Sequence, residues 1–211
     1  SSDGLRRIPS EKMERTAVSE DLFVNLIGAG IRKAAAFYMD FFEIPHEELP
    51  VAEMARHYAK VFEEAQALAL LEEGGIREKD HLNLWCLGMI LQPAHYVESG
   101  VFTGSSLHAV LRSGQIQRIT GIDPNLNHLM MDLSPLGNVE LIDDRDFSEI
   151  NFPEILEPHL VYFDDHINAA KRIREAHEKG FRYLLFDDAT GFEGVCQRKF
   201  PAIPTIPMIL N

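Results

Sequence analysis

The stretch of residues 95–123 constrains the fold of this chain more than any other. It opens with a short strand pattern at residues 95–98, passes through a loop that contains two glycines, and enters a helix pattern at about Ser105. A second strand pattern follows at residues 119–122 and ends at Asp123. The order predicts a strand-loop-helix-strand unit with an acid at the tip of its second strand.

The loop and the acid of this unit are typical of a nucleoside-cofactor site. Gly100 and Gly104 allow the backbone to approach a ligand, and the N-terminus of the following helix presents unpaired N–H groups to an anionic group. Asp123, at the tip of the second strand, is suitably placed to accept hydrogen bonds from both hydroxyls of a ribose. In the alternative interpretation, the glycines only make a tight strand-to-helix turn.

The glycine spacing distinguishes between the nucleoside cofactors. A dinucleotide site requires G-x-G-x-x-G, whereas this chain has Glu98-x-Gly100-x-x-x-Gly104. This pattern resembles the first motif of the class I S-adenosylmethionine-dependent methyltransferases, E/D-x-G-x-x-x-G, and Asp123 matches the acid that the family carries after its second strand. The resemblance implies that the cofactor contacts Glu98, Gly100, Thr103, Gly104 and Asp123.

The composition favours one α/β domain with a helical extension. The 211 residues are 45% hydrophobic and 25% charged, which allows a proper core to be buried. The net charge of −13 argues against a nucleic-acid or anionic-membrane partner, because both need basic patches. Two cysteines are too few for a disulfide framework or a zinc cluster. No apolar run of about 18 residues and no signal peptide is recognised, so we expect a cytoplasmic protein.

The chain divides into two predicted parts. Residues 1–80 form a helical extension or cap, and residues 81–211 form the sheet-containing domain. The first helix pattern, at residues 18–42, contains Gly28 and Gly30, which predict a break or a tight helix contact rather than one smooth helix. A second, amphipathic helix pattern occupies residues 51–73. We expect this part to form a lid on the substrate side or the surface of a homodimer.

Beyond Asp123, strand patterns alternate with helix patterns. The strands are predicted at residues 139–142, 160–163 and 183–186. A short helix is predicted at about residues 127–133, and the clearest helix at residues 167–179. The alternation predicts an α/β fold: a Rossmann-like parallel sheet with helices on both faces and an N-terminal helical extension. Ligands of such a sheet bind at the carboxyl ends of its strands.

Acidic residues follow the third predicted strand. Asp144 and Asp146 come directly after residues 139–142. In the family that the chain resembles, residues at this place line the adenine, and an acid there can accept its exocyclic amine. The resemblance therefore implies Asp144 and Asp146 as adenine contacts, and the alternative is a solvated acidic turn.

Paired acids also follow the fourth and fifth predicted strands. They are Asp164 with Asp165, and Asp187 with Asp188. Because adjacent parallel strands lie about 4.8 Å apart, Asp164, Asp187 and Asp188 can converge at one edge of the sheet. Converging carboxylates repel one another in the absence of a nearby lysine, and a divalent cation such as Mg²⁺ or Mn²⁺ would relieve that repulsion.

The same positions resemble the metal-dependent O-methyltransferases. Residues 162–166 (YFDDH) and 186–190 (FDDAT) are most similar to the cephalosporin-hydroxylase and rhamnosyl O-methyltransferase group. The resemblance covers about residues 82–190. It implies metal ligands among the following residues: Asp164, Asp165, Asp187 and Asp188. Two departures stand out: the lysine base of the catechol type has no counterpart near Ile167, and the compressed D-x-D-H spacing leaves the choice between Asp164 and Asp165 open.

The predicted function is an S-adenosylmethionine-dependent, metal-assisted O-methyltransferase that acts on a small-molecule hydroxyl. His166 and Asp164 are the predicted catalytic residues, with His166 as the group that takes the acceptor proton. One alternative is a methyltransferase-like domain that binds a nucleoside or a partner without catalysis, and another is a metal-dependent hydrolase. The missing lysine favours the first alternative, as does the short segment after Thr190, where residues 201–210 supply at most one more strand.

Overall fold

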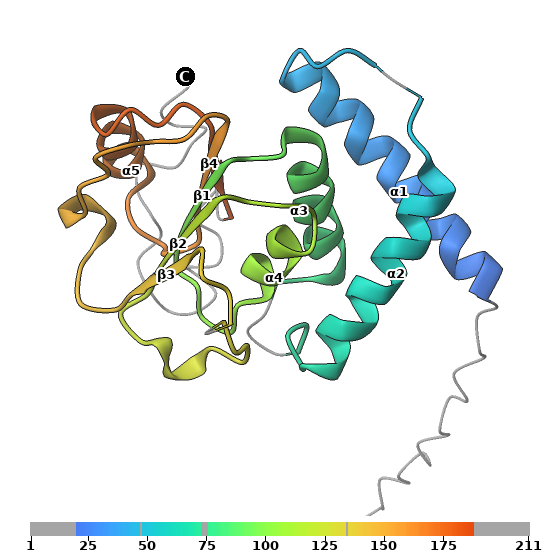
Figure 1. The fold of residues 1–211 in the computed structure, drawn as a ribbon, viewed down its shortest axis with the longest axis horizontal. Helices are drawn as coiled ribbons and strands as arrows, with labels where there is room; N and C mark the ends of the chain where they lie inside the picture. The colour runs from blue at the N-terminus through green and yellow to red at the C-terminus, as the bar shows by residue number, and fades with distance from the viewer. Residues whose placement is uncertain (1–19, 47, 73–75, 134, 188–211) are drawn as a thin grey trace, which may run out of the picture.

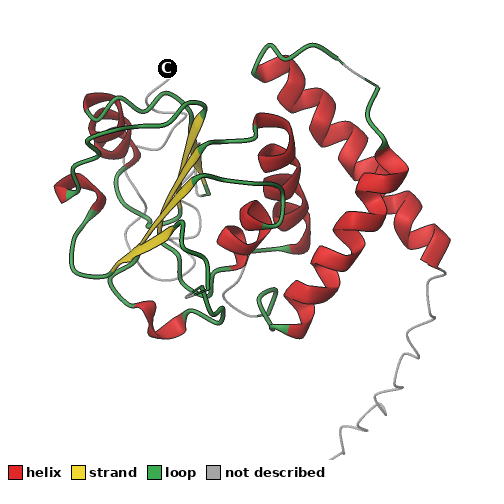
Figure 2. Cartoon of the chain, viewed as in Figure 1, coloured by secondary structure: helices red, strands yellow, loops and turns green. Residues whose placement is uncertain are grey.

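The computed structural model of this protein describes residues 20–187, except residues 47, 73–75 and 134. In this part of the chain, a parallel sheet lies between two layers of helices (Figures 1 and 2). The predicted α/β fold with helices on both faces is therefore confirmed. The strand proposed at residues 201–210 and the predicted metal ligand Asp188 lie outside the described residues.

The sheet has five strands in the order β3-β2-β1-β4-β5, and all neighbouring pairs are parallel. The strands are β1 (His95–Ser99), β2 (Arg118–Ile122), β3 (Val139–Ile142), β4 (His159–Phe163) and β5 (Leu184–Phe186). All five were predicted to within one residue at each end. The central strand β1 is buried along its whole length, as expected for a strand covered on both faces.

The helices divide between the two faces and an outer layer (Figure 1). They are α1 (Glu20–Phe41), α2 (Val51–Ala67), α3 (Glu78–Leu91), α4 (Ser105–Leu111) and α5 (Ala169–Glu178). Helices α3 and α4 cover one face of the sheet, α5 covers the other, and α1 and α2 lie outside α3. Helix α3 contacts both α1 and α4, so it joins the outer helices to the sheet. The boundary predicted at residue 80 stays a prediction.

Helix α1 is continuous, so the break predicted at its two glycines is wrong. The alternative prediction of a tight helix contact is confirmed, because a Cβ atom at Gly30 would lie only 2.8 Å from Leu82 Cδ2 of α3. The helix tolerates the glycine because close packing offsets its low helix propensity. On the outer side of α1, Leu26 and Phe41 are 62% and 64% exposed. A homodimer through this helix stays a prediction.

Two further helix predictions differ from the structure. The helix predicted at residues 51–73 ends at Ala67, because Leu68 no longer has a helical conformation. The short helix predicted around residues 127–133 is a single 3₁₀ turn, Leu126–His128, that begins with an Asx turn at Asn125. A side chain that bonds its own backbone competes with helix propagation, which explains the short turn.

The register of the strands determines where the site forms. Ser99, the last residue of β1, is paired with Ile122 of β2 and with Phe163 of β4. The residues that follow these three strand ends therefore emerge side by side, although they come from distant parts of the chain. This is the edge of the sheet at which the sequence predicted ligand binding.

Candidate functional site

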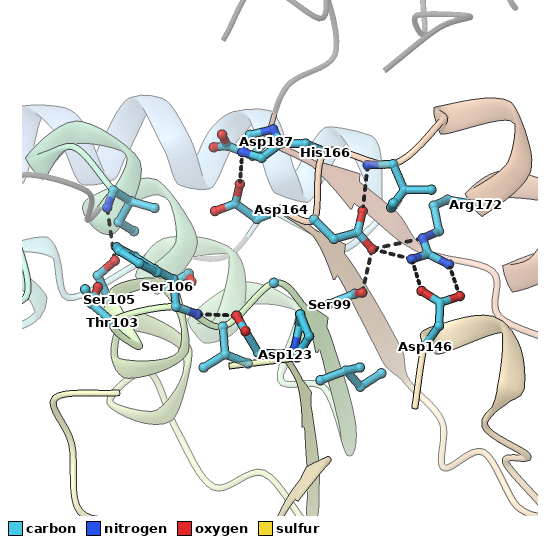
Figure 3. Close-up of a pocket in the computed structure, with 18 of the residues that line it drawn as sticks. Ser99, Thr103, Ser105, Ser106, Asp123, Asp146, Asp164, His166, Arg172 and Asp187 are labelled. Atoms are coloured by element: carbon cyan, nitrogen blue, oxygen red, sulfur yellow. Dashed lines mark hydrogen bonds and ion pairs between the residues drawn. The ribbon is translucent and has the colours of Figure 1, made fainter. Parts of the chain in front are cut away.

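A cavity of about 920 Å³ opens at the carboxyl ends of the strands. Its walls come from the loop after β1, the residues that follow β2, β3, β4 and β5, and the segment that begins α3. Figure 3 shows Thr103 and Ser105 at one end of the cavity, Asp146 and Arg172 at the other, and Asp164, His166 and Asp187 along one side. Most of the predicted site residues therefore meet in one cavity.

Asp123 lies at the tip of β2 and is 9% exposed. Its Oδ2 accepts the backbone N–H of Phe102 at 2.8 Å, and its Oδ1 accepts the N–H of Asn125 at 2.8 Å. These two bonds fix the carboxylate against the glycine loop. Each oxygen keeps a further lone pair with which it can accept a hydroxyl proton.

The glycines of the loop are required by the backbone itself. Gly100 has φ of +95°, and a Cβ atom there would lie 2.4 Å from the backbone oxygen of Asp164. Gly104 has φ of +87° and is the N-cap of α4. The backbone at Gly100 therefore packs against the backbone of Asp164, which brings the loops after β1 and β4 together. This contact fits the interpretation of the glycines as a tight turn.

Thr103 and Ser105 present hydroxyls at the same end of the cavity. Thr103 is 9% exposed, and its Oγ1 has no hydrogen-bond partner among the described residues. Ser105 Oγ accepts the backbone N–H of Ile76 at 3.0 Å and still has its own proton to donate. A buried hydroxyl without a partner is costly, so a polar ligand group at this end would satisfy it.

Glu98 was predicted to contact the cofactor, but it does not line the cavity. It is fully buried, where its Oε1 accepts the Ser106 hydroxyl at 2.6 Å and its other oxygen accepts the Tyr96 hydroxyl. Burial raises the pKa of this carboxyl to about 7. Glu98 is therefore linked to the cavity through Ser106, which lines it at the start of α4.

The acids after β3 have different surroundings. Asp144 lines the cavity and forms an exposed ion pair with Arg145, in which Nε and Oδ1 lie 3.2 Å apart. Asp146 accepts two hydrogen bonds from the guanidinium of Arg172, at 3.0 and 2.6 Å. These bonds hold the pKa of Asp146 well below its usual value. Asp144 is thus the better placed of the two predicted adenine contacts, because the carboxylate of Asp146 is already committed.

Arg172 is the central residue that sequence reasoning missed. Its side chain is 1% exposed and donates to Asp165 at 2.9 Å and to Glu175 at 2.8 Å, besides Asp146. Its position, three residues after Ala169 and four before Ala176, is on the buried face of α5. The helical spacing alone predicts that position 172 is buried. Because arginine is usually exposed, Arg172 was not expected there.

Asp165 joins the end of β1 to helix α5 by hydrogen bonds. Its Oδ2 accepts the Ser99 hydroxyl at 2.5 Å as well as the Arg172 guanidinium, and its Oδ1 accepts the N–H of Ile167 at 3.1 Å. Arg172 is therefore the cation that offsets the charge of Asp165. Of the two aspartates between which the sequence could not choose, Asp164 is the one that faces away from this cluster (Figure 3).

Asp164, His166 and Asp187 form the acidic side of the cavity. His166 Nε2 lies 3.8 Å from Asp164 Oδ1, and its Nδ1 is buried without a partner among the described residues. Tyr162 donates its hydroxyl to Asp187 Oδ1 at 3.1 Å. His166 has φ of +53°, a strained conformation that turns its ring towards Asp164 (Figure 3).

The described residues do not by themselves form a metal centre. No group of three or more histidine, cysteine or acidic side chains in residues 20–187, gaps excepted, is arranged to hold an ion. Asp188, one of the predicted ligands, lies outside the described residues. The metal prediction therefore stays a prediction. In the same part of the chain, no helix is long and apolar enough to cross a membrane.

Comparison with known proteins establishes the fold. No protein-family model and no curated protein matches the chain. Among solved structures, the O-methyltransferase TomG from Streptomyces achromogenes, in complex with SAM, is 15% identical over 85% of this chain and 84% of its own, with a TM-score of 0.50. An O-methyltransferase from Bacillus cereus in complex with SAH is 14% identical over 85% of this chain and 86% of its own, at 0.49.

A shorter similarity is found with cmcI, in a structure described as Mg-SAM. It is 21% identical, at a TM-score of 0.41, over 59% of this chain. The chain spans about 60% of the length of that structure. At 15% identity, the likeness to TomG shows the fold alone. The chain thus has the Rossmann-like fold of TomG, as predicted.

Proposed function

We propose that this protein is an S-adenosylmethionine-dependent O-methyltransferase that acts on the hydroxyl of a small molecule. The observation that carries the proposal is a single cavity that brings together Asp123, the buried Thr103 hydroxyl and the Asp164–His166 pair. The fold supports it, because TomG, which shares the fold, has its structure in complex with SAM.

We expect the cofactor to occupy the cavity in one direction. Its ribose would bind Asp123, whose carboxylate is held by two backbone N–H groups. Its adenine would lie towards Asp144, after β3, and its methionine part along residues 100–104. The acids that line the cavity favour the positively charged sulfonium, because opposite charges attract strongly in a partly enclosed site.

The acidic side of the cavity is where the acceptor would react. The acceptor hydroxyl would give its proton to His166 Nε2, which faces Asp164, and its oxygen would attack the methyl carbon of the sulfonium. The carbon–sulfur bond breaks as the new carbon–oxygen bond forms, and the thioether product leaves uncharged. Asp164 would stabilise the protonated His166, so the residues contribute mainly positioning and charge.

We also propose that the acidic side of the cavity binds a divalent cation, Mg²⁺ or Mn²⁺. Asp164 and Asp187 would supply two of its ligands and Asp188 a third. When bound, such an ion lowers the pKa of an acceptor hydroxyl. Asp165 is not included, because its oxygens already accept bonds from Ser99, Ile167 and Arg172.

Calorimetric titration tests the proposal. S-adenosylmethionine and S-adenosylhomocysteine are titrated into the 211-residue chain, with Mg²⁺ and then with chelator. We expect both to bind, and we expect Asp123→Ala to weaken both at least about 10-fold, because two ribose hydrogen bonds are lost. Asp144→Asn serves as the matched control at the other end of the cavity, with a smaller loss. If neither compound binds under either condition, the methyltransferase proposal is wrong.

Binding without chemistry would select the non-catalytic alternative. A cofactor-loaded sample is incubated with pooled phenols, sugars and polyketide alcohols, and methylated products are sought by mass spectrometry. We expect a product whose formation falls in His166→Ala and Asp164→Ala. Cofactor binding with no transfer to any pool would favour a binding domain over an enzyme.

A further inference from the structure

His166 has an unusual backbone conformation for a residue that is not glycine. Its φ of +53° lies in the left-handed region, where a side chain is crowded against its own backbone. In this conformation His166 Nε2 lies 3.8 Å from Asp164 Oδ1, on the acidic side of the cavity (Figure 3). A strained conformation persists only where the surrounding structure determines it. The support for His166 must therefore come from its neighbours.

The two neighbours of His166 close a tight turn around it. Asp165 Oδ1 accepts the backbone N–H of Ile167 at 3.1 Å, so the side chain before His166 bonds the backbone after it. This is an Asx turn, in which an aspartate side chain takes the place of a backbone residue. Because His166 is the residue that the turn encloses, the position of the Asp165 carboxylate constrains the backbone at His166.

The carboxylate of Asp165 is itself held by two other parts of the fold. Its Oδ2 accepts the Ser99 hydroxyl at 2.5 Å, from the end of β1, and the Arg172 guanidinium at 2.9 Å, from α5. The Asp165 side chain is 14% exposed and that of Arg172 is 1% exposed. Arg172 is held in turn by two hydrogen bonds to Asp146, after β3. One oxygen of Asp165 is thus fixed to β1 and α5, while the other makes the turn.

The backbone that leads into the turn is fixed as well. The N–H of Asp164 donates to the carbonyl of Ser99 at 2.8 Å. Gly100 packs so closely on Asp164 that a Cβ atom at Gly100 would lie 2.4 Å from the Asp164 backbone oxygen. The segment therefore has little freedom to move away from β1, and the strain stays at His166.

We propose that Asp165 is a positioning residue: held by Ser99 and Arg172, it keeps His166 in the left-handed conformation that brings the imidazole to Asp164. This inference rests on the proposed function, in which His166 takes the acceptor proton. It also gives the two consecutive aspartates different roles. Asp164 faces the reaction, whereas Asp165 acts through the backbone of His166.

The conformation is tested by a pair of substitutions at the strained residue. His166→Gly and His166→Ala are compared by urea unfolding in the full chain, and again in chains that carry Asp165→Ala or Ser99→Ala. Alanine normally stabilises a position relative to glycine because it restricts the unfolded chain, but not where φ is positive. We expect the glycine variant to have the higher urea midpoint. This advantage should disappear with Asp165→Ala and shrink with Ser99→Ala, which is the milder change and decides if Asp165→Ala does not fold.

Asn168→Ala is the matched control, because it removes the same kind of bond from the same loop. Asn168 is the N-cap of α5, and its Oδ1 accepts the N–H of Lys171 at 2.9 Å. The glycine advantage should persist in this background, and its loss there would overturn the inference as a general loosening of the loop. A higher midpoint for His166→Ala than for His166→Gly in the otherwise unmodified chain would overturn it too, as would a glycine advantage that survives Asp165→Ala.

Methyl transfer to the pooled alcohols shows whether Asp165 acts through His166. We expect Asp165→Ala to lower the transfer rate at saturating S-adenosylmethionine about 10-fold or more, because a misplaced reacting group is costly. The affinity for S-adenosylhomocysteine should stay unchanged. In the His166→Ala background, Asp165→Ala should cause no further decrease, because nothing remains to be positioned.

Two outcomes of the transfer assay would overturn the inference and leave the proposed function intact. One is an equal decrease by Asp165→Ala in both backgrounds, and the other is an unchanged rate in Asp165→Ala alone. If no pool is methylated, the proposed enzyme fails, and the urea comparison alone decides whether Asp165 holds His166 in place.

Discussion

Two buried polar networks lie on opposite faces of the sheet, and they are built from different chemistry. On the α3 and α4 face, Tyr58 Oη lies 2.9 Å from His81 Nδ1, and His81 Nε2 lies 3.1 Å from His108 Nδ1. On the α5 face, the Arg172 guanidinium binds Asp146, Asp165 and Glu175. The first network is uncharged, and the second is an ion cluster.

The two networks lose stability for different reasons. Burying a neutral hydrogen-bonded chain costs little as long as no proton is gained, so the histidine network fails when it becomes charged. A buried ion cluster tolerates protons poorly as well, but its main risk is the loss of one partner, which leaves the others uncompensated. The α5 face carries the strand-end loops of the cavity, so its failure would also distort the site.

The largest expected effect is on the ion cluster. Arg172→Met should lower the free energy of unfolding by about 3 to 5 kcal/mol, because three carboxylates lose a common buried partner. Urea unfolding measures it. Arg145→Met removes an ion pair whose side chains are 49% and 74% exposed, and it should cost less than about 1 kcal/mol. Similar losses in the two variants would contradict the distinction between the networks.

The two networks should lose stability at different pH values when the solution is acidified. Burial, with a smaller contribution from His108, lowers the pKa of His81 to about 3. The unfolded chain titrates near 6.5 and binds the proton first, so stability falls as the pH drops from about 6.5 towards 3, by up to about 1.4 kcal/mol per pH unit. Urea unfolding at pH 7.5, 5.5 and 4.5 should show this slope, and His81→Gln should flatten it. An equal slope in the variant would exclude His81 as its origin.

The ion cluster should respond only at lower pH. The hydrogen bonds from Arg172 keep the pKa of Asp146 below its ordinary value of 3.8, so its contribution is complete above that pH and is lost below it. The two networks therefore lose stability in different pH ranges, which one pH series can separate.

A smaller effect is expected at Glu98, which lies between the networks on the central strand. Burial raises its pKa to about 7, so the folded state holds a proton that the unfolded state releases above about 4.5. Its contribution is thus complete below that pH and is lost as the pH rises towards 7. In the unmodified chain, the free energy of unfolding should fall by about 1 to 3 kcal/mol between pH 5 and 8.5 because of Glu98. Glu98→Gln should not show this decrease in thermal or urea unfolding. An unchanged pH profile would show that Glu98 is ionised in the fold.

The smallest effect is expected at the rim of the histidine network. Glu64 accepts two hydrogen bonds from Arg112 and lies 3.6 Å from His108 Nε2, but the Glu64 and Arg112 side chains are 38% and 42% exposed. Glu64→Gln should therefore cost less than about 1 kcal/mol in urea unfolding. A decrease in the free energy of unfolding as large as that of Arg172→Met would mean that ion pairs stabilise both faces of the sheet equally.

The parts of the fold that were predicted are those that depend on local pattern. Strand periodicity located all five strands, and the rule that parallel strands end at one edge placed Asp123, Asp164 and Asp187 in one cavity. The continuity of α1 was missed because Gly30 is stabilised by Leu82, a contact between helices far apart in the sequence. Propensity contains no information about such contacts.

The site was predicted less completely for the same reason. The burial of Arg172 depends on Asp146 and Asp165 from two other segments, besides Glu175 of its own helix. The path of residues 76–77 into the cavity depends on a bond to Ser105. Glu98 matched a motif position, yet its neighbours Tyr96 and Ser106 keep it beneath the cavity. A motif identifies the residue types of a site, whereas the surrounding packing decides which of them face a ligand.

The strand order has a consequence for how the site comes into being during synthesis. The bond between Ser99 and Asp165 joins residues 66 positions apart, and β4 enters the sheet beside β1 only after β2 and β3 have been made. At about 5 to 20 residues per second, the glycine loop would wait several seconds on the ribosome for the segment that completes its cavity. A nascent chain halted before residue 159 should therefore lack the complete cavity, even though it already contains the whole glycine motif.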